Sequence, residues 1–114
     1  MILEIRTYRL KPGTTDAFVR VMHEEAVPML EKHGITVVDY GASLVREQPD
    51  WEEAYIMRAF PSLDAHQQQE EAFYSSQEWL EGPREAVISR IESYHTIVIE
   101  TSQAAVDALT RPRA

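Results

Sequence analysis

The stretch that decides the fold is the first one, Met1-Ile-Leu-Glu-Ile-Arg-Thr-Tyr-Arg-Leu-Lys-Pro-Gly13. Its side chains alternate with the period of two that is typical of a β-strand, here over residues 2–10. The two phases of this strand are Leu3, Ile5 and Thr7 on one side and Glu4, Arg6 and Tyr8 on the other. We expect the apolar phase to face the core and the helices, and the polar phase to line a surface or a pocket.

Length and composition describe one globular domain. The chain has 114 residues, of which 44% are hydrophobic and 26% charged, enough for one ordinary core. It contains no cysteine, which excludes disulfides, thiol nucleophiles and thiolate metal sites. Neither a long apolar run nor a secretion leader is visible, so we expect a cytoplasmic protein with no membrane association.

The charge balance argues against a polyanionic partner. The chain carries 19 acidic and 11 basic residues and a formal net charge of −8. Nucleic-acid binding requires a basic surface that neutralises phosphates, so we expect no nucleic-acid partner.

The rest of the chain alternates between helix and strand signals. A helix is expected from Thr14 or Thr15 to about His33, with Pro28 kinking or breaking its last turn. Gly41 indicates a bulge or a close backbone approach in the second strand. The remaining predicted elements are strands at 35–46, 51–60 and 94–100 and helices at 63–75 and 83–92.

This order predicts an α+β fold of the ferredoxin-like βαββαβ type, with helices on one face of a four-stranded antiparallel sheet. Strand residues are apolar in both phases, so we expect a second copy of the chain to cover the open face. Residues 1–101 are expected to form the domain, and residues 102–114 a weakly structured extension that frays at Arg111-Pro112-Arg113.

Four short motifs resemble the NIPSNAP family. The opening Glu4-Ile-Arg-Thr-Tyr-Arg-Leu-Lys-Pro-Gly13 is similar to the family pattern E-x-R-x-Y-x-L-K-P-G. The similarity continues at Pro28-Met-Leu-Glu-Lys-His-Gly34, Phe60-Pro-Ser-Leu63 and Glu78-Trp79, and covers about residues 2–100. The second-helix segment, rich in Gln and Glu, departs from the common pattern.

The resemblance implies a ferredoxin-like fold that pairs as a dimeric α/β barrel, with two sheets facing a central space. Most members of the family have no known activity. Relatives that share this architecture include cofactor-free monooxygenases, haem-degrading enzymes, decarboxylases and dehydratases, and fold analogy alone does not choose among them.

Three residues are candidates for catalysis. Arg6 would hold an anionic oxygen, Tyr8 would donate a proton or hydrogen bond, and Asp39 would move a proton. The alternative is an ion pair of Arg6 with Glu4 or a neighbouring acid, with Tyr8 packed in the interface. If the polar phase faces the barrel interior, these groups line its cavity.

Six further residues are candidates for contacting a small organic ligand. They supply acids, hydroxyls and apolar or aromatic walls, the usual composition of a pocket. Ordinary dimer packing is the alternative interpretation for most of them. They are Glu4, Ser43, Trp51, Tyr55, Met57 and His66.

The histidines form no recognised metal motif, so neither a metal nor another cofactor is expected. The sequence thus leaves three hypotheses open. The protein is a cofactor-independent oxygenase, isomerase or lyase acting on a small molecule in the barrel cavity, a non-catalytic binding module, or a purely structural dimer.

Overall fold

A four-stranded sheet with strand order β2-β3-β1-β4 is the framework of the computed structural model, which describes residues 1–112. Both neighbours of β1 pair with it in antiparallel fashion, and β2 pairs with β3 in the same way. The predicted ferredoxin-like βαββαβ fold is therefore confirmed. The strands are β1 (Ile2–Leu10), β2 (Thr36–Ala42), β3 (Glu52–Phe60) and β4 (Ile91–Glu100).

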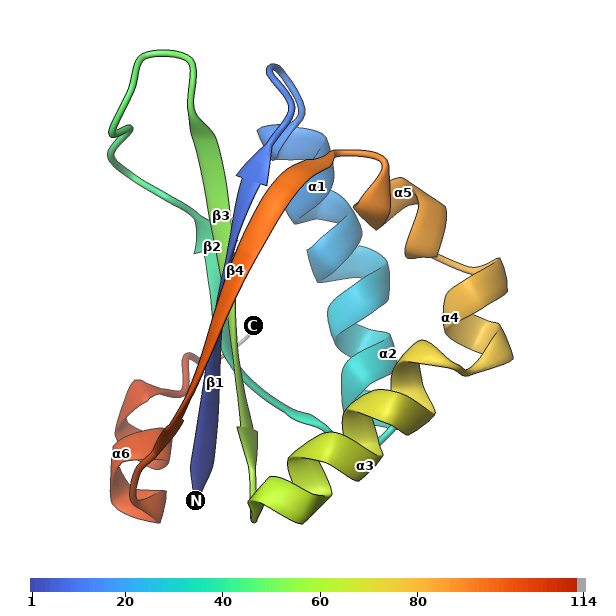
Figure 1. Ribbon diagram of the computed structural model, residues 1–114, viewed down its shortest axis with the longest axis vertical. Helices are drawn as coiled ribbons and strands as arrows, with labels where there is room; N and C mark the ends of the chain where they lie inside the picture. Colours follow the sequence, from blue (N-terminus) through green and yellow to red (C-terminus); the bar gives the residue numbers. More distant parts are fainter. Residues whose placement is uncertain (113–114) are drawn as a thin grey trace.

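Helices cover one face of this sheet, and a single short helix lies against the other (Figure 1). The first group forms a layer that runs from the N-terminal half of the chain into its second half. It consists of α1 (Thr15–Val21), η1 (Met22–Ala26), α2 (Val27–Lys32), α3 (Leu63–Tyr74), α4 (Gln77–Glu81) and α5 (Arg84–Ile88). The helix on the opposite face is α6 (Gln103–Leu109).

The first helical stretch passes through Pro28 without breaking. Pro28 has no N–H to donate, and it lies in the first turn of α2. The preceding turn, η1, is a π-helix in which the N–H of Val27 donates to the carbonyl of Met22, five residues back. The helical stretch therefore widens before Pro28 instead of ending there.

Strand β1 turns its polar phase, and not its apolar phase, towards the helices. Tyr8 and Leu10 belong to the main core with Phe18 of α1, and the side chain of Glu4 is 0% exposed. The expected orientation of this strand is thus wrong. The reason is that Glu4 is neutralised on the helical side by Arg58 of β3, which removes the usual penalty for burying a carboxylate.

The other face of the sheet carries a second, smaller apolar cluster. Val106 of α6 packs there against Leu3, Val38 and Ala59. Residues 103–109 therefore form a helix that packs on the sheet, and the prediction that this segment is weakly structured is wrong. The Ser102 hydroxyl caps this helix by accepting a hydrogen bond from the N–H of Ala105. The predicted fraying at Arg111 to Arg113 lies partly outside the described residues, because these end at residue 112.

Much of this face stays uncovered by α6. Ile97 and Ile99 of β4 are 47% and 40% exposed, beside their β1 partners Ile5 and Leu3. Within residues 1–112, no helix has the length and apolar character needed to cross a membrane.

Several predicted boundaries differ from the structure. Strand β4 begins at Ile91, three residues earlier than expected, and α5 ends at Ile88, so the predicted helix over residues 83–92 is shorter. Strand β2 ends at Ala42, four residues earlier than expected, and Leu44 is 98% exposed in the following loop. The irregular pairing of β2 falls between Val37 and Asp39 and not at Gly41, whose nearest neighbour is the Tyr55 ring. The predicted strand is too long because Leu44 and Val45 are apolar, although they lie in the loop and do not pair with β3.

Gly82, which follows α4, is expected to tolerate no side chain. A Cβ atom there would lie 2.3 Å from the carbonyl oxygen of Glu78, so we expect Gly82→Ala to lower the free energy of unfolding by about 1 to 3 kcal/mol. Gly41→Ala is the matched control, because its Cβ would meet the Tyr55 ring at 3.6 Å, an ordinary contact. Urea unfolding of both variants measures the difference, and equal stabilities would contradict the prediction.

Candidate active site between the sheet and the helices

A cavity of about 310 Å³ lies between the sheet and its layer of helices. This volume is at the lower end of the range of roughly 300–1,000 Å³ that small-molecule pockets occupy. Its walls are mainly apolar and aromatic, and polar side chains gather at one part of its lining. The apolar and aromatic lining residues are Tyr8, Met22, Ala26, Leu30, Ile56, Phe73, Tyr74, Trp79, Val87, Ile88, Ile91 and Tyr94.

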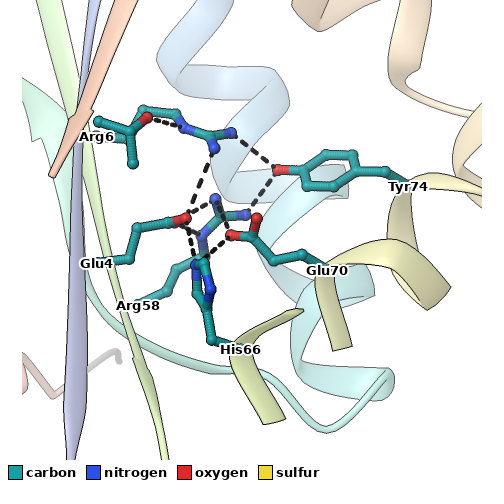
Figure 2. Close-up of polar contacts among 7 residues, drawn as sticks. Glu4, Arg6, Arg58, His66, Glu70 and Tyr74 are labelled. Carbon is teal, nitrogen blue, oxygen red and sulfur yellow. Dashed lines mark hydrogen bonds and ion pairs between the residues drawn. The ribbon is translucent and has the colours of Figure 1, made fainter. Parts of the chain in front are cut away.

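The polar part of the site is assembled from β1, β3 and α3 (Figure 2). Glu4 and Arg58 are direct cross-strand neighbours in the β1–β3 pair. His66, Glu70 and Tyr74 follow one another at four-residue intervals, so they share one face of α3. That face points at the sheet, where the six labelled side chains converge.

Arg58 is the organising cation of the group and is 1% exposed. Its Nε donates to Glu4 Oε2 at 2.6 Å, its Nη1 to the Tyr74 hydroxyl at 2.7 Å and its Nη2 to Glu70 Oε1 at 3.0 Å. All three nitrogens are thus engaged, and the guanidinium joins both carboxylates to one phenol. Tyr74 and Glu4 outweigh the effect of burial and raise the pKa of Arg58 above its usual range.

Arg6 is held more loosely. Its Nε donates to Thr96 Oγ1 at 2.8 Å and its Nη1 to the Tyr74 hydroxyl at 3.3 Å. Its Nη2 lies 3.6 Å from Glu4 Oε1, an ion pair without a hydrogen bond. The guanidinium also lies over the ring of Tyr94, 5.1 Å from its centroid. Arg6 therefore presents a positively charged edge that lines the cavity.

The two carboxyl groups of the site, Glu4 and Glu70, have very different pKa values. Burial opposes ionisation of Glu4, but its hydrogen bond with Glu70 and the charges of Arg58 and Arg6 prevail and lower its pKa to about 2. Burial and the adjacent Glu4 raise the pKa of Glu70 to about 7. Only Glu70 of this pair lines the cavity. The cavity thus has a carboxyl group that can gain or lose a proton near neutral pH.

Tyr8 contributes a neutral hydroxyl to the same lining. Burial raises the pKa of Tyr8 to about 12, so the phenol keeps its proton under ordinary conditions. Its ring packs against Phe18, with the centroids 5.1 Å apart. Tyr8 is therefore a fixed hydrogen-bonding wall of the cavity.

A metal ion fits this site poorly. Glu4, His66 and Glu70 offer ligand atoms that lie within 4.8 Å of one another. However, Arg58 already donates to both carboxylates, and its guanidinium occupies the position of a counter-ion. A divalent cation would have to displace a buried charge of the same sign.

The proposed site residues fall into separate groups. Glu4, Arg6, Tyr8 and His66 meet on the helical side, where His66 Nε2 lies 3.1 Å from Glu4 Oε1. Asp39 lies on the opposite face and accepts a hydrogen bond from the Tyr55 hydroxyl at 2.9 Å. The sheet therefore separates Asp39 from Arg6 and Tyr8, and the prediction that all three share one cavity is wrong.

The other predicted ligand contacts also lie away from this cavity. Met57 packs against the second cluster under α6. The Ser43 hydroxyl donates to the carbonyl of Val45 in the loop after β2. Trp51 carries the guanidinium of Arg9, 4.2 Å from its ring centroid. None of these three lines the space that Arg6 and Glu70 share.

Sequence reasoning missed Glu70 and Tyr74 as site residues. The signal was available in the four-residue spacing of His66, Glu70 and Tyr74, which marks one polar face of a helix. That face looked like solvated surface because it lies within a run rich in Gln and Glu. Arg58 of β3 joins this face of α3 to the sheet through its contact with Glu70.

The fold defines a ferredoxin-like α+β protein with a cavity between its sheet and its helices. Comparison with known proteins gives the family. The NIPSNAP family model matches residues 3–103, and the chain belongs to the NIPSNAP family. No curated protein matches the sequence.

Solved structures support the same assignment. The chain is similar to Atu4242 from Agrobacterium tumefaciens, described as a NIPSNAP family protein with unknown function, at 26% identity over 90% of this chain and 95% of that chain, with a TM-score of 0.78. A second NIPSNAP family protein from the same organism, Atu5224, shares 20% identity over 90% and 93% of the two chains, with a TM-score of 0.72.

A more distant structure shares the fold alone. SnoaB, a cofactor-independent oxygenase from Streptomyces nogalater, is 10% identical over 90% of this chain and 93% of that chain, with a TM-score of 0.57.

The raised pKa of Glu70 predicts a pH-dependent stability. Because this pKa is about 7 in the folded state and about 4.3 in an unfolded chain, the folded state binds the proton more tightly. The resulting stabilisation is complete below about pH 4 and is lost as the pH rises through about 7. We expect the free energy of unfolding to fall by about 2 kcal/mol between pH 5 and pH 8 through this group.

Urea titrations at several pH values measure this dependence. Glu70→Gln should remove that part of the slope, whereas Glu71→Gln, the same change at an exposed neighbour on α3, should retain it. Identical slopes in the two variants would contradict the assignment of the titration to Glu70.

Proposed function

We propose that this protein is a cofactor-independent enzyme that transfers a proton on a small organic molecule in the cavity between the sheet and the helices. One observation carries the proposal. The Glu70 carboxyl group, the Arg6 guanidinium and the Tyr74 hydroxyl line one cavity whose other walls are mainly apolar and aromatic. A base placed beside oxyanion-stabilising donors is the arrangement that removal of a proton next to a carbonyl or phenol requires.

In the proposed reaction, Glu70 acts in its ionised form. It takes a proton from a carbon next to the substrate's carbonyl group. The electron pair of that C–H bond forms a C=C bond, and the π pair of the C=O bond moves to the oxygen. Arg6 and Tyr74 stabilise the resulting enolate through charge and hydrogen bonding. Return of the proton from Glu70 to a different atom gives an isomer, so no other reactant is consumed.

Oxygenation is the second candidate, and it shares the same first step. Five aromatic side chains line the cavity: Tyr8, Phe73, Tyr74, Trp79 and Tyr94. Such walls suit an aromatic substrate whose anion is delocalised enough to transfer an electron to O₂, the co-reactant. The oxygenase from Streptomyces nogalater has the same fold, which makes this chemistry compatible with the architecture and does not assign it.

Solvent-deuterium exchange tests the proposed proton transfer. Phenylpyruvate is a suitable probe because it joins an enolisable carbon to a phenyl ring and a carboxylate. We expect the protein to accelerate exchange at the carbon between the ring and the ketone, as followed by NMR in D₂O. Glu70→Gln should reduce that acceleration by about 10² or more, the usual contribution of a general base.

Glu71→Gln is the matched control and should exchange at the rate of the unchanged protein. An oxygen electrode run in parallel distinguishes the two candidates, since isomerisation consumes no O₂. If Glu70→Gln exchanges as fast as the unchanged protein, Glu70 is not the base. If the protein binds phenylpyruvate without any acceleration of exchange, it is a binding module and not a proton-transfer enzyme.

We also propose that the chain forms a homodimer through the sheet face that carries α6. Ile97 and Ile99 are exposed there beside the apolar phase of β1, and a second copy would remove these side chains from water. The pairing would place the two sheets face to face as a dimeric α/β barrel. The cavity of each protomer lies on the other side of its sheet. Cytoplasmic location stays a prediction.

Light scattering after size exclusion tests the dimer. We expect the mass of two chains for the unchanged protein and of one chain for Ile97→Glu, because a buried charge in the interface would lack a partner. Leu80→Glu is the control, since Leu80 is 53% exposed on α4, in the helical layer. The mass of one chain for the unchanged protein would refute the dimer.

A further inference from the structure

Arg6 has N–H donors at the cavity that are not all used in hydrogen bonds. A guanidinium carries five N–H donors, and Arg6 uses them for one bond to Thr96, one long bond to Tyr74 and an interaction with the Tyr8 hydroxyl. Its Nη2 lies 3.6 Å from the Glu4 carboxylate, which is too far for a hydrogen bond. Arg58, by contrast, donates from all three of its nitrogens. Arg6 is therefore the cation with donors available to a ligand.

Tyr74 offers a second donor at the same place. Its oxygen accepts N–H bonds from both Arg6 and Arg58, and the part of the chain that the structure describes provides no acceptor for its own hydrogen. Two guanidiniums at the oxygen withdraw electron density and make the hydroxyl a stronger donor. Arg6 and Tyr74, joined to each other and both lining the cavity, form a paired donor site.

The charges around this site favour an anion. Arg6 and Arg58 supply two positive charges, Glu4 supplies one negative charge, and Glu70 is neutral whenever it holds its proton. The other titratable groups facing Glu70 or the cavity are Tyr8 of β1, His66 and Tyr74 of α3, and the exposed Arg84 of α5. The cavity is thus locally cationic, although the whole chain carries a net charge of −8.

We propose that the ligand of this cavity is a small aromatic carboxylate whose carboxylate group binds Arg6 and Tyr74 and whose ring packs against the aromatic wall that Phe73 and Trp79 form together. This assignment rests on the cavity of the proposed function and names its substrate class. The ring walls exclude water around the ion pair, which strengthens it. An anion beside Glu70 also favours the protonated form of that group, so binding takes up a proton near neutral pH, and the proposed proton abstraction proceeds from the fraction of complexes in which Glu70 is ionised.

Calorimetric titration with 2-naphthoate tests the proposal on the unchanged protein. Its neutral isostere, 2-naphthamide, has the same ring system without the charge. We expect the carboxylate to bind at least about tenfold more tightly, the ordinary contribution of charge-assisted hydrogen bonds. We also expect its affinity to fall between pH 6 and pH 8, with a smaller change in Glu70→Gln. Absence of naphthoate binding, or equal binding of the two compounds, would overturn the proposal.

Two variants locate the carboxylate. Arg6→Gln should weaken naphthoate binding at least about tenfold and leave naphthamide binding nearly unchanged, whereas Arg20→Gln removes the same charge from an exposed site on α1 and should change neither. Tyr74→Phe should weaken naphthoate binding, with Tyr55→Phe on the opposite sheet face as its control. If both test variants bind as their controls do, the carboxylate does not sit on Arg6 and Tyr74.

The naphthoate-binding test and the deuterium-exchange test can give a negative result independently of each other. Tight naphthoate binding that depends on Arg6, together with no deuterium exchange, would leave the ligand class standing and remove the catalytic proposal. Exchange that depends on Glu70, together with equal binding of the charged and neutral compounds, would do the reverse. Circular dichroism confirms that each variant is folded before it is scored.

Discussion

The buried contact between Glu4 and Arg58 is the constraint on which the rest of the structure depends. The two side chains are neighbours across β1 and β3 and are 0% and 1% exposed. Neither charge could be buried alone, because an uncompensated ion in a protein interior costs several kcal/mol. Together, and with Glu70 and Tyr74 as further partners of Arg58, they make a polar centre that the helices can cover.

This contact determines which way the sheet faces. Once Glu4 points at the helices, Arg6 and Tyr8 must follow it, because alternate residues of a strand share one face. Leu3 and Ile5 are then left on the other side, where α6 covers only part of the apolar surface. The same choice therefore creates a polar cavity on one side of the sheet and an apolar face that suits a second copy on the other.

The opposing acidities within the site follow from the same geometry. Glu4 takes the strongest of the contacts to the guanidiniums and stays ionised, whereas Glu70, at the end of the network, keeps a pKa of about 7. Two carboxyl groups in one network thus acquire different roles through their surroundings. One holds the structure together, and the other faces the cavity with an exchangeable proton.

The sequence alone determined the order of strands and helices, the family, and the shared phase of Glu4, Arg6 and Tyr8 on β1. Local periodicity and turn chemistry carry that information, because they act over a few residues. Only the tertiary structure decided which face of β1 is covered, that Asp39 lies across the sheet from Arg6, and that Glu70 and Tyr74 complete the site. Those outcomes depend on contacts between residues of different elements, such as Glu4 with Arg58, Tyr55 with Asp39 and Arg58 with Glu70. These contacts make it favourable to bury the polar side chains of β1 in the core, where solvent exposure would otherwise be preferred. The local sequence pattern contains no information about such contacts.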